Sequence, residues 1–195
     1  MFRKSKPREL IPRIKIIGDG LTEYYYFKHL KKLKYQRANI ELNKSDFDKS
    51  QNIDKKIRKI KLQFKDIYSI IIIVFDIEND ENKKKLFKEK IKLLKKIEVL
   101  GLYSNPSIEY WFLLHYEDTN KSFDANNLKS YIKKYINDYS TSESFLDNEN
   151  WVNDLLNNLK IAIERAKKYK NSNQSYTNIN EGIEKLDFIC NKTLK

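Results

Sequence analysis

The sequence predicts an α/β protein in which a parallel sheet flanked by helices is followed by a helical C-terminal half. Short β-branched runs alternate with helical spacings up to about residue 106. Residues 68–75 are apolar at nearly every position, which is typical of a central strand covered on both faces. Only helical patterns follow Pro106. The chain has four Gly and three Pro in 195 residues, so it has few turns and no flexible linker.

The first part of the chain alternates candidate strands with candidate helices. The strands are β-branched or apolar runs and are expected at residues 13–17, 39–42, 68–75 and 101–104. The helices have apolar residues three and four positions apart and are expected at residues 22–33, 53–64 and 86–100. This alternation predicts a parallel sheet with right-handed crossovers.

The second part of the chain reads as helices joined by polar loops. Helices are expected at residues 108–116, 128–139, 151–169 and 179–189, and loops at residues 137–150 and 170–176. We therefore expect one domain over residues 1–195. Its α/β core spans about residues 13–106, and a helical part at about residues 107–195 packs on that core.

The composition indicates a cytoplasmic protein. The single cysteine, Cys190, excludes an intrachain disulfide and a cysteine-based zinc site. The longest apolar run, residues 70–75, is far shorter than the roughly 20 residues of a membrane helix. The first twelve residues are basic but lack the apolar segment of a secretory signal. Nothing in the sequence indicates a membrane partner or an oligomeric state.

The charge suggests a polyanionic partner such as RNA or DNA. Lys and Arg total 39 against 27 Asp and Glu, a net charge of +12. Lys-rich stretches lie at residues 83–96 and 129–134, and Lys133, Lys134 and Tyr135 place cations next to an aromatic ring, a combination that binds single strands. The alternatives are a solvated helix face and the Lys-rich composition of an AT-rich genome.

Acidic residues follow two of the predicted strands. Asp19 comes directly after the first strand, and Asp76 and Glu78 follow the most hydrophobic one. Open α/β sheets bind ligands at the carboxyl ends of their strands, so these carboxylates are expected to meet there. Mg²⁺, with Mn²⁺ as the alternative, is the ion that such carboxylates hold for phosphoryl chemistry. The other interpretation is a set of turn residues leading into a helix N-terminus.

Four motifs in order resemble the RloB-like family. They lie at residues 16–27 (IIGDGLTEYYYF), 74–78 (VFDIE), 104–116 (SNPSIEYWFLLHY) and 175–179 (SYTNI). The resemblance implies a Toprim-like fold, in which a Glu after the first strand and an Asp-x-Asp after a later one hold Mg²⁺ for phosphodiester chemistry. It also implies a phage-defence or abortive-infection effector, a nuclease restrained or triggered by an ABC- or AAA-type ATPase encoded nearby.

Two positions depart from the family pattern. Asp19 stands where the family has Glu, and Glu78 stands where it has the second Asp. Each change moves the carboxylate by about 1.5 Å and keeps its charge. Glu23, on the first helical turn, is a candidate to place a carboxylate where the shorter Asp19 side chain does not reach. The other interpretation is a capping-box acid with Gly20 as N-cap. The resemblance thus implies Asp19, Asp76 and Glu78 as metal ligands.

The third motif adds one candidate. Glu109 and His115 are about 240° apart around a helix, so they do not share a face. We expect a helix with Pro106 near its first position, in which His115 is buried and structural. Glu109 is then a catalytic candidate together with Asp19 and Glu23, or else an ion-pair partner of a lysine.

Three functions remain open from the sequence. The first is a Mg²⁺-dependent nuclease of RNA or DNA. The second is a non-catalytic subunit that binds nucleic acid or the ATPase. The third is a nucleotide-sensing module that uses the same crevice.

Overall fold

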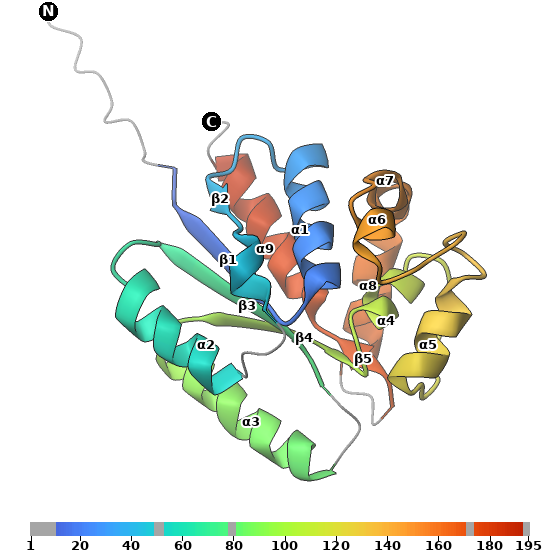
Figure 1. Ribbon diagram of the computed structural model, residues 1–195, viewed down its shortest axis with the longest axis horizontal. Helices are drawn as coiled ribbons and strands as arrows, with labels where there is room; N and C mark the ends of the chain where they lie inside the picture. The colour runs from blue at the N-terminus through green and yellow to red at the C-terminus, as the bar shows by residue number, and fades with distance from the viewer. Residues whose placement is uncertain (1–10, 49–52, 78–80, 171–173, 193–195) are drawn as a thin grey trace, which may run out of the picture.

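A five-stranded sheet lies at the centre of the protein, in a computed structural model that describes residues 11–48, 53–77, 81–170 and 174–192 (Figure 1). The strand order is β2-β1-β3-β4-β5. The strands are β1 (Ile14–Gly18), β2 (Ile40–Glu41), β3 (Ile70–Asp76), β4 (Leu100–Asn105) and β5 (Tyr176–Thr177). The first four pair in parallel, as predicted, which confirms the α/β class.

The fifth strand makes the sheet mixed. Ser104 of β4 pairs with Thr177 of β5 in antiparallel register. Tyr176 was predicted to end a loop over residues 170–176, and this prediction is wrong at that residue. A two-residue strand has no periodicity of its own, and β5 is held instead by side-chain bonds such as the one between Ser104 Oγ and Thr177 Oγ1, at 2.8 Å.

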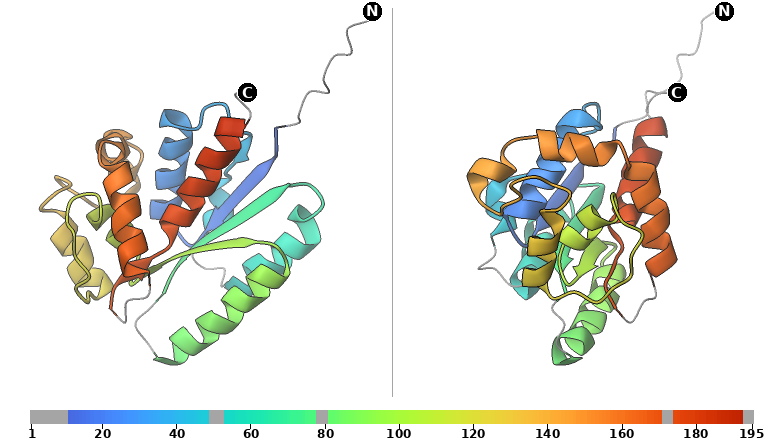
Figure 2. Two further views of the ribbon diagram at one scale, coloured as in Figure 1. Left: turned by 180° about the vertical axis from the view of Figure 1, so that it is seen from behind. Right: turned by 90° about the vertical axis from the view of Figure 1, so that its right-hand side faces the viewer.

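Helices cover both faces of the sheet (Figures 1 and 2). On one face lie α2 (Ile53–Lys59), its π-helical continuation η2 (Ile60–Phe64) and α3 (Glu81–Lys96). On the other lie α1 (Leu21–Leu33) and α9 (Ile179–Lys192). The strand β3 supplies apolar side chains to both layers, because Ile72 and Val74 face α1 and α9 while Ile71 and Ile73 face α2 and α3.

The remaining described helices are one short helix that follows β2 and five helices that come after β4. They are the 3₁₀ helix η1 (Lys44–Phe47), α4 (Glu109–Leu113), α5 (Ala125–Ile132), α6 (Glu143–Leu146), α7 (Asn150–Leu156) and α8 (Leu159–Tyr169). Helices α4 to α8 share one apolar core with α1 and α9. Within it the Trp111 indole donates to the Tyr26 hydroxyl at 2.7 Å. Among the described helices, none combines the length and the apolar character needed to cross a bilayer.

Several predicted helix bounds are wrong. The helix expected at residues 86–100 ends at Lys96, because Glu98 adopts a left-handed conformation (φ 59°) that turns the chain into β4. The helix expected at residues 108–116 shortens to α4, so Pro106 lies outside its first turn. The helix expected at residues 128–139 begins earlier and ends at Ile132.

Two further corrections concern the C-terminal region. The single helix expected at residues 151–169 is two helices, α7 and α8, which are separated at residues 157–158. The loop expected at residues 137–150 contains α6, whose N-cap Ser142 accepts a hydrogen bond from the Phe145 backbone N–H. Local capping therefore produces a helix in a stretch without apolar periodicity.

A lysine is buried inside the apolar sheet. Lys15, in the middle of β1, has no exposed surface. Its ammonium lies 2.9 Å from Glu41 Oε1 and 2.8 Å from Asp46 Oδ2, and Asp46 also pairs with Lys59 of α2. A buried charge is tolerated when it is paired in this way.

Candidate functional site

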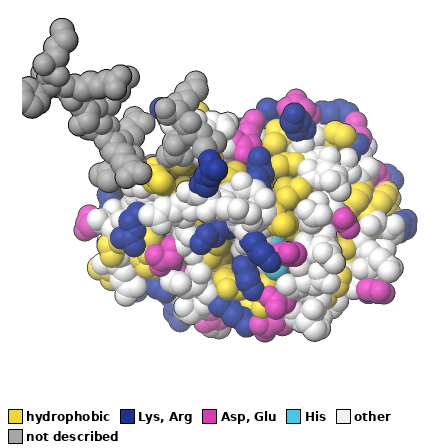
Figure 3. Space-filling model, turned by 90° about the horizontal axis from the view of Figure 1, so that it is seen from above, with side chains coloured by type: hydrophobic (Ala, Val, Ile, Leu, Met, Phe, Trp, Pro, Cys, Tyr) yellow, Lys and Arg dark blue, Asp and Glu magenta, His cyan; other side chains and the backbone are white. Residues whose placement is uncertain are grey.

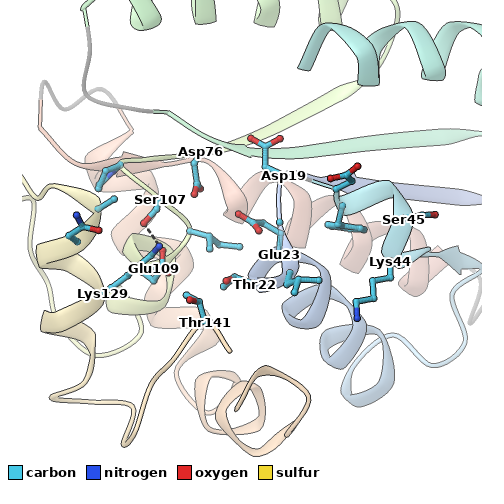
Figure 4. A pocket seen from close by; sticks show the side chains of 18 residues that line it. Asp19, Thr22, Glu23, Lys44, Ser45, Asp76, Ser107, Glu109, Lys129 and Thr141 are labelled. Carbon is cyan, nitrogen blue, oxygen red and sulfur yellow. Dashed lines mark hydrogen bonds between the residues drawn. The ribbon is translucent and has the colours of Figure 1, made fainter. Parts of the chain in front are cut away.

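A pocket of about 850 Å³ opens where β1 and β3 end (Figure 4). Its walls come from the start of α1, from η1, from the segment that enters α4 and from α5. The lining carries four carboxylates that the sequence singled out: Asp19, Glu23, Asp76 and Glu109. Two lysines, Lys44 and Lys129, also line it.

The sheet register brings the acids together. Gly18 of β1 pairs with Val74 of β3, so Asp19 and Asp76 follow at the same edge. Glu23 reaches this edge from the first turn of α1, and Glu109 from the start of α4. The two strands are adjacent, so Asp19 and Asp76 follow neighbouring strands, as their expected meeting requires. Figure 4 shows Asp76, Glu23 and Glu109 around one space, whereas the Asp19 carboxylate points away from Glu23.

Burial and mutual repulsion disfavour the ionised form of two of these acids. The pKa of Glu23 rises from 4.5 to about 7, first because the side chain is desolvated and then because Glu109 and Asp19 repel its charge. The pKa of Asp76 rises well above its usual value for the same reasons, with Glu23 as the strongest neighbour. A cation placed between these carboxylates would therefore be stabilised.

Asp19 already has a cationic partner. The Lys56 ammonium, on α2, donates to Asp19 Oδ1 at 2.7 Å and to the Gly18 carbonyl at 2.5 Å. Lys56 is buried, with 2% of its surface exposed. Its charge also lowers the pKa of Glu23. Asp19 therefore lies at the expected edge but is directed toward a fixed ammonium.

Glu109 is held by two neutral donors. The Ser107 hydroxyl donates to Glu109 Oε2 at 2.5 Å, and the Tyr139 hydroxyl donates to Oε1 at 2.9 Å. In the part of the chain that the structure describes, Glu109 makes no ion pair, so the lysine partner expected as an alternative is not seen. Both donors fix the orientation of a carboxylate that is 2% exposed.

The capping interpretation of Glu23 is only partly met. Gly20 is the N-cap of α1, as that interpretation requires, but a glycine has no side chain that could accept a hydrogen bond from the helix. The backbone hydrogen bond that stabilises the ionised Glu23 carboxylate comes from its own residue rather than from Gly20. Glu23 is 4% exposed and lines the pocket, so its carboxylate belongs to the acidic group.

The other predicted site residues lie elsewhere. Glu78 falls outside the described residues. Lys133, Lys134 and Tyr135 are exposed in the turn after α5 and do not line the pocket. Lys134 lies 3.9 Å from the centre of the Tyr131 ring, and Tyr135 donates its hydroxyl to Glu117 at 2.9 Å.

His115 is buried, as expected. Its Nδ1 lies 2.9 Å from the Trp111 carbonyl, which can only accept, so Nδ1 carries the proton. Burial lowers the His115 pKa to about 4. A neutral imidazole packed edge-on against Trp111 fits the structural role predicted for it.

The donor set suits a hard cation in part. Among the described residues, which leave out Glu78, no three acidic, histidine or cysteine side chains are grouped closely enough to hold a metal ion. Mg²⁺ however commonly uses one or two carboxylates and completes its shell with waters and substrate phosphate. Asp76 and Glu23, both carboxylates whose charge is destabilised, fit this smaller requirement.

Sequence reasoning missed Lys56, Ser107 and Tyr139. Lys56 lies four positions before Ile60, on the buried face of its helix, which is the signal that could have singled it out. Ser107 precedes Glu109 by two residues within the third motif, which is the signal that could have indicated a partner for that acid. Tyr139 had no local signal, because only the tertiary fold brings it to Glu109.

Comparison with known proteins gives one match. The sequence model of the RloB family, described as RloB-like protein, matches residues 14–186. The matched region includes Asp19, Glu23, Asp76 and Glu109 and both lysines of the pocket lining. Neither the curated proteins nor the solved structures contain a match to this chain.

Proposed function

Because the chain belongs to the RloB-like family, we propose that it is a metal-dependent phosphodiesterase of Toprim-like type that cleaves RNA or DNA as an effector of phage defence. The observation that carries this proposal is the pocket at the carboxyl ends of β1 and β3. There, the buried Glu23 and the partly buried Asp76 destabilise each other's charge. Such an arrangement is costly unless a ligand neutralises it.

The acids have different roles in this proposal. Asp76 and Glu23 would hold Mg²⁺ or Mn²⁺, and Glu78 and Asp19 are the further ligands that the family resemblance implies. When bound, the ion would stabilise the negative charge that develops on the phosphoryl oxygens. Asp19 can bind the metal ion only if its carboxylate gives up its hydrogen bond with Lys56.

Glu109 is the candidate to orient the attacking water. Its carboxylate is fixed by Ser107 and Tyr139, so its remaining lone pairs have defined directions. Hydrolysis adds the water oxygen to phosphorus, passes one water proton to a carboxylate and breaks one P–O bond to sugar, and the sugar oxygen that leaves takes a proton from solvent water. Lys44 and Lys129 at the pocket lining would attract the phosphate.

The test is a cleavage assay. Purified protein is incubated with tRNA, mRNA and DNA in Mg²⁺ or Mn²⁺, beside Asp76→Ala and the control Asp66→Ala, which removes an exposed acid outside the pocket. We expect cleavage by the wild type and by Asp66→Ala, and none by Asp76→Ala. Equal products from all three would mean a contaminating nuclease and would leave the proposal without support.

One observation favours a second function, a non-catalytic subunit that binds nucleic acid or an ATPase. Lys56 already neutralises Asp19, as expected of an acidic site that works without a metal ion. In that case no substrate is cut and Mg²⁺ leaves stability unchanged. Both functions include a partner ATPase of ABC or AAA type, which co-purification with the product of a neighbouring gene would reveal.

A further inference from the structure

Exposed cations line the outer surface of the layer formed by α2, η2 and α3. We name this surface the α2–α3 basic face, and its residues are Arg58, Lys61, Lys65, Lys88, Lys92, Lys95 and Lys96. Within the described residues, none of them has an ion-pair partner. The exposed acids beside them are Asp66, Glu89 and Glu98, while Asp54 is paired with Lys90. The face is therefore strongly positive.

Several lysines elsewhere on the molecule are neutralised by ion pairs. Where α1 meets the C-terminal helices, the ion pairs are Lys28–Asp147, Lys32–Glu149 and Lys34–Asp187. Figure 3 shows basic and acidic side chains intermixed on the end of the molecule that it views. Lys28, Lys32 and Lys34 thus each have an acidic partner, whereas the seven cations of the α2–α3 basic face have none among the described residues.

The geometry of the face is regular. Lys88, Lys92 and Lys95 are four and three positions apart, so they form one stripe about 10 Å long on α3. Another side of α3 packs on the sheet through Ile91 and Leu94. The ion pair between Lys90 and Asp54, at 2.5 Å, holds α3 beside α2.

The face leads to the pocket. Lys56, near the start of α2, reaches Asp19 at the pocket edge. Helix α3 follows β3, whose last residue is the pocket acid Asp76. Both helices thus start at the edge of the sheet that carries the pocket and run from there along one face of the sheet (Figure 1).

We propose that the α2–α3 basic face binds the phosphate backbone of the nucleic acid and guides it to the pocket. Lysine ammonium groups are point charges that attract phosphate without reading bases, so binding should not depend on sequence. The inference rests on the proposed function for the class of ligand. It assigns the main contact to this face rather than to Lys133, Lys134 and Tyr135.

The experiment compares two variants that each lose three charges. The face variant is Lys88→Gln, Lys92→Gln, Lys95→Gln, and the control is Lys160→Gln, Lys185→Gln, Lys192→Gln, from exposed positions on α8 and α9. Gln keeps the helix propensity of Lys. Affinity for mixed-sequence RNA and DNA oligonucleotides is measured by fluorescence anisotropy in EDTA over a range of salt. A third variant, Lys133→Gln with Lys134→Gln, tests the other surface.

We expect the face variant to bind at least tenfold more weakly at low salt. Its slope of log affinity against log salt should fall by about 2 to 3, because about 0.9 counterion is released for each phosphate that the protein neutralises. The control should stay within about twofold of the wild type. Equal losses of affinity in the face variant and the control would mean that affinity depends only on net charge, and this result would overturn the inference. A larger loss in the Lys133 and Lys134 variant, or no binding by the wild type, would also overturn it.

Two further measurements complete the experiment. The first distinguishes nucleic-acid binding from membrane binding. The second distinguishes a failure of this inference from a failure of the proposed function. If the wild type binds phosphatidylserine vesicles but no nucleic acid, the face serves a membrane surface and the inference fails. Hydrolysis of bis(p-nitrophenyl) phosphate in Mn²⁺ needs only the pocket. If it depends on Asp76 while the face variant binds nucleic acid normally, the inference alone fails. If the face variant loses binding but no hydrolysis occurs, the proposed function alone fails.

Discussion

The Lys56 ammonium donates a 2.7 Å hydrogen bond to the Asp19 carboxylate and so connects α2 to the end of β1. This contact decides which acids of the pocket remain without a cation. Asp19 is paired, whereas Glu23 and Asp76 repel each other. The pair also bears on the two proposed functions, because Asp19 can bind a metal ion only if its carboxylate releases Lys56.

Lys56→Met should destabilise the fold and raise the pKa of Glu23 further. The Gly18 carbonyl and Asp19 lose their donor, which costs about 1–3 kcal/mol of unfolding free energy. The Glu23 carboxyl loses the nearby positive charge that lowers its pKa. Urea denaturation and carboxyl-carbon NMR titration measure the two effects. Lys59→Met, which breaks the pair with Asp46, should lower stability but leave the pKa of Glu23 near 7. An equal pKa in both variants contradicts the prediction.

The stability of the metal-free protein should fall between about pH 4.5 and pH 7. The folded-state pKa of Glu23, about 7, exceeds its ordinary value of 4.5, so the folded state holds a proton that the unfolded state has lost. Stability from this group is complete below pH 4.5 and is lost as the pH rises toward 7. The difference between the two values corresponds to about 3 kcal/mol. Urea denaturation in EDTA at pH 5 and pH 8 should show this loss for the wild type and a smaller loss for Glu23→Gln, which keeps Asp76 and its raised pKa. Glu164→Gln, an exposed change, should behave like the wild type.

Asp76→Asn should abolish cleavage while it keeps or increases thermal stability without metal. The change removes one of the repelling charges at nearly constant shape. Added Mg²⁺ should raise the Tm of the wild type, because a ligand that binds only the folded state stabilises it, and should raise the Tm of the variant less. Differential scanning fluorimetry with and without Mg²⁺ provides the comparison. Full activity in Asp76→Asn would make Asp76 a structural turn residue and would favour the non-catalytic function.

Gly182→Ala should destabilise the packing of α9 on the sheet. A Cβ built on Gly182 would lie 2.3 Å from Leu102 Cδ1, and Leu102 is fully buried in β4. Overpacking of this kind costs about 1–3 kcal/mol. Chemical denaturation measures the loss. The double variant Gly182→Ala with Leu102→Val should recover part of it, since the shorter side chain makes room, and no recovery would mean that the clash lies elsewhere.

The part of the fold that could be predicted is the part with strong apolar patterns. The runs around Ile16 and Ile72 predict adjacent buried strands, and the structure pairs them. Helix ends could not be predicted, because they depend on single residues such as Glu98, whose left-handed backbone stops α3 from reaching β4. Strand β5 could not be predicted either, because its two residues are placed by contacts with β4.

The candidate site was predictable in outline but not in geometry. Asp19 and Asp76 each follow a strand, so their shared edge follows from parallel pairing. The direction of the Asp19 side chain depends on Lys56, which is 37 residues away on another element. The donors to Glu109 likewise include Tyr139, which is 30 residues away. Long-range side-chain contacts of this kind leave no periodic trace in the sequence.

The burial of Lys15 has a consequence for how the strands find their alignment. β3 presents Ile70, Ile71, Ile72 and Ile73 in succession to β1, so apolar matching alone would accept a shift of β1 by two residues. Such a shift would carry the Lys15 ammonium away from Glu41 and Asp46 and leave it in an apolar layer. An isolated buried ammonium costs several kcal/mol, far more than one isoleucine packing against its neighbour contributes. Lys15 therefore selects one alignment of β1 from several that bury the same apolar side chains. That alignment in turn fixes where Asp19 lies relative to Asp76 at the edge of the sheet.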